Sequence, residues 1–228
     1  MTASDDFDDK KILRAWRANA SPWTRAVREQ KIESRRVTTD QAIVDTIVSL
    51  APERVLDIGC GEGWLARALS RRHIAVTGID GIQDLVNAAS QSGGGRFRLL
   101  PYEQLGRDSF DETFDLVACN FSLLGKESVE RVFRVVPDLL AEGGHFVVQT
   151  LHPVSSCGEM PYVDGWRQGT WAGIDEAFSD PAPWYFRTVT SWRTLFRENG
   201  FTLVDEKEPP HPVNGEPVSL LMVAARAS

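Results

Sequence analysis

The sequence has few cysteines and histidines and no long apolar run. Its three cysteines include no C-x-x-C pair, which excludes a disulfide framework and a zinc ribbon. Its four histidines lack metal-ligand spacing, and no stretch approaches the roughly 18 apolar residues that a membrane span needs. The start is acidic, unlike a signal peptide. We therefore expect a cytoplasmic protein without a bound metal or a membrane partner.

Basic residues are also too few for a surface that binds nucleic acid broadly. Lys and Arg number 25 and Asp and Glu 32, a formal charge of −7, which disfavours binding to a phosphate backbone. Hydrophobic residues at 42% and charged residues at 25% are typical of a globular protein and exclude the disordered and fibrous classes. For 228 residues we expect one domain, as a monomer or a homodimer.

Short apolar runs alternate with helical patterns through most of the chain. This alternation predicts an α/β fold, with a mostly parallel sheet and helices on both of its faces. A helix that begins near Val129 is expected to kink or restart at Pro137. The strands are expected at residues 55–58, 74–79, 97–100, 114–119, 145–150, 201–205 and 218–225.

Two regions lie outside this alternation. Residues 1–50 look helical, whereas residues 151–187 form an insert rich in proline, glycine and tryptophan that lacks clear periodicity. A loop of that length is more often a lid or a binding segment than a spacer. Residues 188–228 are expected to form a helix and two strands joined by an antiparallel return.

Residues 55–63, Val-Leu-Asp-Ile-Gly-Cys-Gly-Glu-Gly, form the most informative motif. A strand, a glycine turn and a helix follow in the order that lets free N–H groups at the helix start meet a nucleotide-type ligand. The spacing is G-x-G-x-G rather than the G-x-G-x-x-G of dinucleotide sites. Asp57 and Glu62 flank the turn, and two carboxylates would repel a pyrophosphate. We therefore expect a cationic ligand such as S-adenosylmethionine.

Asp80 follows the second predicted strand, 23 positions after Asp57. An acidic residue at that place can accept hydrogen bonds from both hydroxyls of a ribose. The alternative is that Asp80 caps the helix that begins near Ile82, since Asp is a favoured N-cap residue. Its position downstream of a glycine loop favours the ribose role.

These motifs resemble those of the class I S-adenosylmethionine-dependent methyltransferases. The similar segments are the first motif at residues 55–63, the second at 76–80, the fourth at 114–120, and the turn before the fifth strand at 139–144. The resemblance covers residues 38–150 and implies a Rossmann-like seven-stranded sheet of order 3-2-1-4-5-7-6, with the last strand antiparallel. It also implies that residues 1–50 form a helical lid over a cofactor-binding core at residues 51–150.

The resemblance further implies a cofactor site. Family members often carry Asp after the third strand, but Pro101 stands there in this sequence, so Tyr102 and Glu103 are expected to hold the adenine. Arg35 is predicted to reach the methionine carboxylate from the lid, the alternative being a solvated basic face. The predicted cofactor-binding residues are Arg35, Asp57, Gly59, Cys60, Gly61, Glu62, Leu65, Asp80, Gly81, Ile82, Tyr102, Glu103, Asn120 and Phe121.

Methyl transfer from a sulfonium needs alignment, plus a base where the acceptor is protonated. His152 follows the fifth predicted strand, at the edge where open α/β sheets bind ligands. We predict that His152 is the catalytic base or orients the acceptor. The alternative is a structural histidine that braces the following loop.

The insert at residues 151–187 is expected to form the acceptor side. Its aromatic rings can either pack as a satellite core or line a small apolar or planar acceptor. Arg167 and Arg187 are candidate anchors for an acceptor carboxylate, with solvated side chains as the alternative, and the aromatic neighbours of Arg187 favour it. The predicted substrate-binding residues are Trp166, Trp171, Tyr185 and Arg187.

The sequence thus predicts an enzyme that transfers a methyl group from S-adenosylmethionine to a small-molecule acceptor and leaves S-adenosylhomocysteine. Two alternatives stay open. A nicotinamide-dependent oxidoreductase would need a glycine loop without neighbouring carboxylates, which Glu62 argues against. A non-catalytic module would bind the cofactor and form no product, and the intact loop and Asp80 disfavour it.

Overall fold

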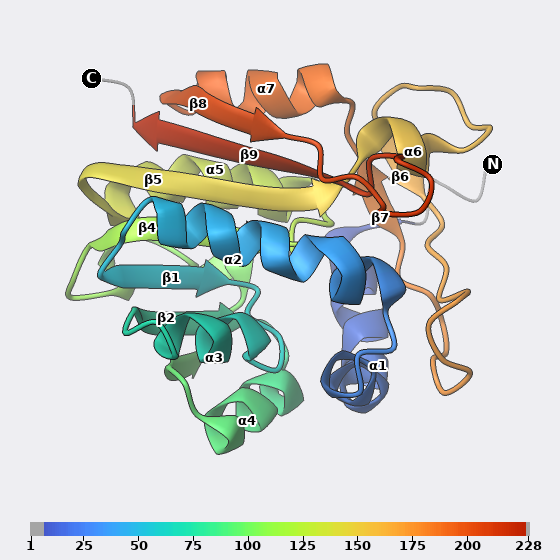
Figure 1. The fold of residues 1–228 in the computed structure, drawn as a ribbon, viewed down its shortest axis with the longest axis horizontal. Coiled ribbons are helices and arrows are strands. Elements are labelled where there is room, and N and C mark those ends of the chain that lie inside the picture. The colour runs from blue at the N-terminus through green and yellow to red at the C-terminus, as the bar shows by residue number, and fades with distance from the viewer. Residues whose placement is uncertain (1–6, 227–228) are drawn as a thin grey trace.

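Seven strands form the central sheet of the computed structural model, which describes residues 7–226 (Figure 1). The first six residues of the expected lid and the last two of the expected C-terminal segment lie outside the described residues. The strands are β1 (Arg54–Ile58), β2 (Ala75–Asp80), β3 (Arg96–Leu99), β4 (Phe114–Asn120), β5 (Leu140–Leu151), β8 (Phe201–Lys207) and β9 (Ser219–Arg226).

The strand order is β3-β2-β1-β4-β5-β9-β8. The strands from β1 to β5 are parallel, and β9 runs antiparallel to both β5 and β8. β8 and β9 are the sixth and seventh strands of this sheet, because β6 (Gly165–Arg167) and β7 (Trp184–Phe186) pair separately. The predicted order with an antiparallel last strand is therefore confirmed.

Helices cover both faces of the sheet (Figure 1). α5 continues through Pro137 and ends at Leu139, so of the predicted kink or restart, the restart does not occur. A proline this close to the helix end removes one hydrogen bond, to the carbonyl of Phe133. The helices are α1 (Asp9–Arg28), the π-helical η2 (Arg35–Thr39), α2 (Asp40–Ser49), α3 (Trp64–Ser70), α4 (Gln83–Ser92), η3 (Tyr102–Gln104), η4 (Arg107–Ser109), α5 (Glu127–Leu139), α6 (Pro153–Cys157) and α7 (Val189–Glu198).

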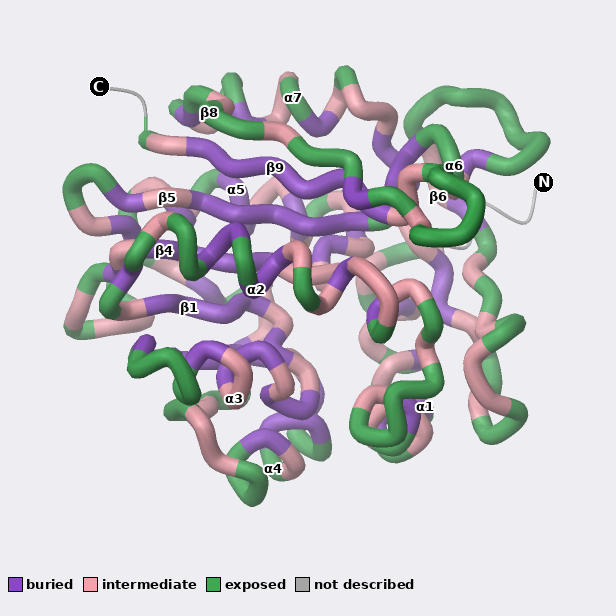
Figure 2. Tube along the Cα trace, in the orientation of Figure 1, coloured by how far each residue is buried: buried purple, intermediate pink, exposed green. Residues whose placement is uncertain are grey.

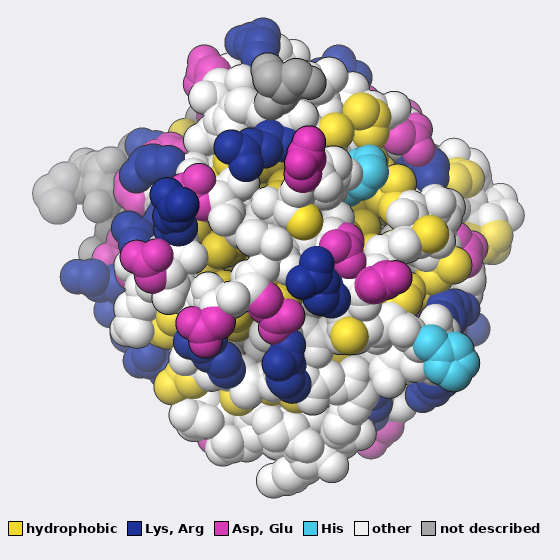
Figure 3. All heavy atoms as spheres, turned by 90° about the vertical axis from the view of Figure 1, so that its left-hand side faces the viewer, with side chains coloured by type: hydrophobic (Ala, Val, Ile, Leu, Met, Phe, Trp, Pro, Cys, Tyr) yellow, Lys and Arg dark blue, Asp and Glu magenta, His cyan; other side chains and the backbone are white. Residues whose placement is uncertain are grey.

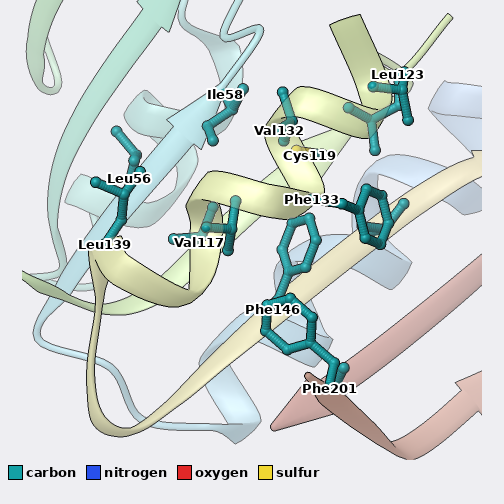
Figure 4. Close-up of a cluster of buried hydrophobic side chains, with 14 of the residues drawn as sticks. Leu56, Ile58, Val117, Cys119, Leu123, Val132, Phe133, Leu139, Phe146 and Phe201 are labelled. Carbon is teal, nitrogen blue, oxygen red and sulfur yellow. The ribbon is translucent and has the colours of Figure 1, made fainter. Parts of the chain in front are cut away.

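Alternate residues of the parallel strands supply two hydrophobic cores, one on each face. Leu56 and Phe146 pack with Phe133 of α5 on one face (Figure 4). Val55 and Leu116 pack with α2 and α3 on the other. Both faces are covered, so the central strands are buried along most of their length (Figure 2), which explains their near-continuous apolar runs.

The carboxyl ends of the parallel strands meet at one edge of the sheet. α1 and the insert lie beside this edge (Figure 1). The insert is more regular than its composition indicates, because α6 follows β5 directly and β6 pairs antiparallel with β7. The sheet therefore presents the turns after its strands to a lid and to a small second sheet.

The opposite end of the molecule has a surface of mixed charge. Lys and Arg side chains lie among Asp and Glu side chains on that face (Figure 3), an arrangement that favours no single sign of ligand charge. No helix within residues 7–226 combines the length and the apolarity that a membrane span requires.

Phe133 provides a test of the core. Its ring centroid lies 5.1 Å from that of Phe146 and 4.8 Å from that of Phe196. We expect Phe133→Ala to lower the free energy of unfolding by about 3–5 kcal/mol, because it removes buried contacts and leaves a cavity. Chemical denaturation measures this loss. Val204→Ala, at an exposed position of β8, is the control, and an equal effect of both substitutions would contradict the assignment of the core.

Candidate active site

A cavity of about 640 Å³ lies at the carboxyl ends of the parallel strands. Its wall includes residues 59–61 after β1, Asp80 at the end of β2 and Asn120 at the end of β4. α1 and the insert contribute the remaining sides. Open α/β sheets bind ligands at this edge, and the volume lies within the range of small-molecule sites, about 300–1,000 Å³.

Two glycines of the loop after β1 need the left-handed backbone region. Gly59 has a φ of +78°, and a Cβ there would lie 2.3 Å from Cβ of Ser122, so no other residue fits. Gly61 has a φ of +55°, and a Cβ there would meet only Nε1 of Trp23, at 3.6 Å. The backbone at Gly61 is therefore open to the cavity.

Asp80 holds this loop in place. Its Oδ2 accepts a hydrogen bond from the Gly61 N–H at 2.9 Å, and its Oδ1 accepts one from the Ile82 N–H at 2.9 Å. Burial raises the pKa of Asp80 to about 6, and the two amide donors oppose that rise. The N-cap of α4 is Ile82 rather than Asp80. Asp80 lies in the cavity wall, where its carboxylate can accept further hydrogen bonds.

Asp57, a predicted cofactor-binding residue, is instead buried behind the loop, outside the cavity wall. Its Oδ2 has no hydrogen-bond partner. Burial, with a contribution from the charge of Asp80, raises the pKa of Asp57 to about 7. The loop therefore has one buried carboxylate behind it and another in the cavity wall, and a positive charge would stabilise both.

Glu62 does not face the cavity, contrary to the prediction. Its carboxylate is fully buried and accepts hydrogen bonds from Arg67 at 2.6 and 2.8 Å and from Arg28 at 3.0 Å. These two guanidinium groups compensate its charge, so only Asp57 and Asp80 remain to repel a diphosphate. Leu65, also predicted as a cofactor contact, packs in the hydrophobic core against α2.

The other predicted cofactor residues lie in the cavity wall: Arg35, Gly59, Cys60, Gly61, Asp80, Gly81, Ile82, Tyr102, Glu103, Asn120 and Phe121. The Tyr102 hydroxyl donates to the carbonyl of Ser122 at 3.2 Å, and burial raises its pKa well above the usual value. Phe121 has a φ of +52°, a conformation that is strained for a bulky residue. This strain lies directly after β4, next to Asn120.

Arg35 lies in η2 and is buried in the cavity wall. Its Nε and Nη2 donate to Asp40 at 2.9 and 3.3 Å. Its guanidinium carbon lies 4.7 Å from the ring centroid of Trp64 and 5.7 Å from that of Trp23. The predicted alternative, a solvated basic face, therefore does not describe this residue.

His152 lies outside the large cavity, so the structure gives no support to its prediction as the catalytic base. It is the N-cap residue of α6, and its Nδ1 accepts from the Ser155 N–H at 3.4 Å. Its Nε2 lies 3.3 Å from Oε1 of Glu208, and the ring is buried. This is the alternative stated above, a histidine that braces the segment after β5.

Of the predicted substrate-binding residues, only Trp171 lies in the cavity wall. Trp166 and Tyr185 pack against each other across β6 and β7. Arg187 donates to the carbonyls of Gly125 and Lys126 at 2.8 and 3.1 Å, so it supports the start of α5 instead. These three residues are corrections to the prediction.

Several residues of the wall are not among the predicted site residues, although Trp184 belongs to the aromatic rings of the insert that are expected to pack or to line the acceptor. Trp16 of α1 and Trp184 of β7 both line the cavity, as does Asp9. Asp9 accepts hydrogen bonds from the N–H groups of Lys126 and Ser128 at 2.9 and 2.6 Å, which fixes the lid to the start of α5. The only sequence signal was the density of tryptophan in the two segments, and no local pattern marked Asp9.

Comparison with known proteins decides the family. A family model described as a methyltransferase domain matches residues 17–206. The chain belongs to the S-adenosylmethionine-dependent methyltransferase family. A solved S-adenosylmethionine-dependent methyltransferase from Mesorhizobium loti is 26% identical, with a TM-score of 0.61 over 80% of this chain and 96% of that one.

Two further proteins are similar to this methyltransferase. A Burkholderia thailandensis 1,6-didemethyltoxoflavin-N1-methyltransferase, solved with S-adenosylhomocysteine bound, has a TM-score of 0.65 at 19% identity over 100% of this chain and 92% of its own; this likeness shows the fold alone. A ubiquinone biosynthesis O-methyltransferase from Marinobacter nauticus is 34% identical over 115 residues. The match spans 48% of each chain, about half of that relative's length.

The residues of this methyltransferase fit S-adenosylmethionine. The unpartnered Oδ2 of Asp57 and the buried carboxylate of Asp80 suit a ligand that carries a sulfonium and an ammonium. The backbone at Gly61 is open to the cavity on the side where such a ligand would approach. Among residues 7–226 no group of three or more His, Cys, Asp or Glu side chains is arranged to hold a metal ion.

Asp80 gives the sharpest test of this site. Asp80→Asn replaces one of two acceptor oxygens with an amide group that cannot accept from a backbone N–H. We expect the affinity for S-adenosylhomocysteine to fall by about 1–3 kcal/mol, measured by titration calorimetry. Asp84→Asn, on the exposed side of α4, serves as the control. An unchanged dissociation constant in a folded Asp80→Asn protein would remove Asp80 from the site.

Proposed function

We propose that this methyltransferase transfers the methyl group of S-adenosylmethionine to a small-molecule acceptor and releases S-adenosylhomocysteine. The observation that supports the proposal is the continuity of the cavity, whose wall includes both the glycine loop and the insert. Donor and acceptor can then share one space. That is what an in-line displacement at the methyl carbon requires.

The cofactor half of the cavity has a donor or an acceptor for each polar part of S-adenosylmethionine. In this proposal Asp80 accepts hydrogen bonds from the ribose, and Asp57 compensates positive charge from behind the loop. Arg35 uses its Nε and Nη2 for Asp40, so its Nη1 is left for the methionine carboxylate. Tyr102 and Glu103 flank the adenine. The bound cofactor supplies a methyl group that is already activated by the sulfonium.

The lid and the insert exclude water in this proposal. Asn19 of α1 is fully buried, and its side chain donates to the Ser179 carbonyl at 2.7 Å and accepts from the Ser179 N–H at 2.9 Å. Lys31 pairs with Asp175 at 2.5 Å. These contacts join two segments that are far apart in the sequence, and a closed, dry cavity strengthens alignment and electrostatic interactions.

No histidine lies in the cavity wall formed by residues 7–226. We therefore propose that catalysis rests on alignment and on exclusion of water rather than on an imidazole base. Acceptors that are nucleophilic near neutral pH fit this arrangement best. Phenols of low pKa, carboxylates and aromatic amines meet that condition, and alkyl alcohols do not.

Incubation with S-adenosylmethionine and a panel of such acceptors tests the function. S-adenosylhomocysteine and a methylated product are expected in equal amounts, detected by mass spectrometry, and only when an acceptor is present. Asp80→Asn should reduce the rate, and Asp84→Asn should leave it unchanged. Tight binding of the cofactor without product from any acceptor would contradict the proposal in favour of a non-catalytic module. Preferential binding of NAD would contradict it in favour of an oxidoreductase.

A further inference from the structure

Arg167 of β6 is a buried cation in the cavity wall without an acidic partner. It is 6% exposed. Its Nη1 donates to the Cys157 carbonyl at 3.1 Å and its Nη2 to the Pro161 carbonyl at 2.8 Å. No ion pair joins it to an Asp or Glu among the residues that the structure describes. Arg35, the other arginine of this wall, is paired with Asp40.

A buried guanidinium without a counter-ion is costly, by several kcal/mol after relaxation. Carbonyl partners satisfy some of its N–H groups but leave its net charge in place. The Phe186 ring, whose centroid lies 3.4 Å from the guanidinium carbon, compensates part of that charge through a cation–π contact. An anionic ligand group in the cavity would compensate the rest.

Arg187 is an internal comparison. It is also buried, donates to two backbone carbonyls and lies against aromatic rings. It does not line the cavity, so no ligand can reach it, and its role is to hold the start of α5. Arg167 differs from Arg187 because it lies in the wall of the cavity, where a ligand can reach it.

The cavity wall that includes Arg167 is rich in aromatic rings, and the centroid of the Trp184 ring lies 5.9 Å from the guanidinium carbon of Arg167. Trp171 and Trp184 line the cavity from the insert, and Trp16 lines it from the lid. The ring of Trp171 is fixed by an edge contact with Trp16, at 5.5 Å between centroids, and by its Nε1–H, which donates to the Ser179 carbonyl at 3.0 Å. Rings held in this way favour a planar ligand over a flexible one.

We propose that the methyl acceptor is a planar aromatic acid whose carboxylate pairs with Arg167. This inference rests on the proposed function. The guanidinium and a carboxylate match in geometry and charge, and the aromatic wall accepts the ring. A carboxylate at Arg167 leaves the rest of the acceptor in the same space as the glycine loop, where the methyl group is delivered.

Matched acids and amides test the proposal. Salicylate with salicylamide, and anthranilate with anthranilamide, differ in charge while keeping nearly the same shape. Their dissociation constants are measured by calorimetry on protein saturated with S-adenosylhomocysteine. Each acid is expected to bind about 10- to 100-fold more tightly than its amide, the scale of a charge-assisted hydrogen-bonded pair.

Three variants assign that preference to Arg167. Arg167→Gln should abolish the difference in affinity between acid and amide. Arg167→Lys keeps the positive charge but loses the planar, two-pronged donor geometry of the guanidinium, so it should retain part of that difference. Both should bind S-adenosylhomocysteine as the wild type does. Arg193→Gln, at an exposed position of α7 that pairs with Glu206, should change nothing.

The contradicting outcomes are separate from those of the proposed function. Equal binding of acid and amide by the wild type, binding of neither at millimolar concentration, or a preference that survives in Arg167→Gln would each overturn the inference. If Arg167→Gln does not fold, the acid and amide affinities of the wild type and of Arg167→Lys still test the inference. Failure of S-adenosylhomocysteine to bind the wild type would overturn the proposed function and this inference with it.

Discussion

The carboxylate of Asp80 connects the end of β2 to the glycine loop after β1. It accepts from Gly61 with one oxygen and from Ile82 with the other. Asp57 is buried behind the same loop. The two carboxylates together favour a positively charged ligand at this edge of the sheet. The cavity lies at that edge, and the proposed positions of the cofactor and the acceptor both depend on it.

The acceptor side is built differently, from segments that lie far apart in the chain. Asp9 fixes the lid to the start of α5, and Asn19 fixes it to the insert at Ser179. Neither segment closes the cavity alone. A movement of the lid away from α5 or from the insert would break one of these sets of hydrogen bonds, which are few and local enough to permit it.

The parts that local patterns encode could be predicted from the sequence. The strands and the glycine loop follow from buried apolar runs and from turns that only glycine allows, whereas the strand order is what the family resemblance implies. The outer parts depend on contacts between distant residues. Glu62 is neutralised by Arg28, 34 positions away, and no spacing rule reveals that. His152 follows β5 as expected, but it caps α6 and lies outside the cavity wall.

Most of the residues of the insert that line the cavity could not be predicted from the sequence either. The aromatic neighbours of Arg187 in the sequence favour it as the anchor, yet Arg167 of β6 is the one that lines the cavity. Because the side chains of a strand alternate between its two faces, a segment without a periodic pattern leaves that choice undetermined.

The electrostatic basis of cofactor binding is tested most directly by the number of protons released when S-adenosylhomocysteine binds, obtained by calorimetry in buffers of different ionisation enthalpy. Burial raises the pKa of Asp57 to about 7, so the free protein holds a proton there below that pH, and a ligand ammonium that favours the carboxylate expels it. We expect proton release near pH 7 for the wild type and less for Asp57→Asn. Binding without proton release in the wild type would contradict this electrostatic basis.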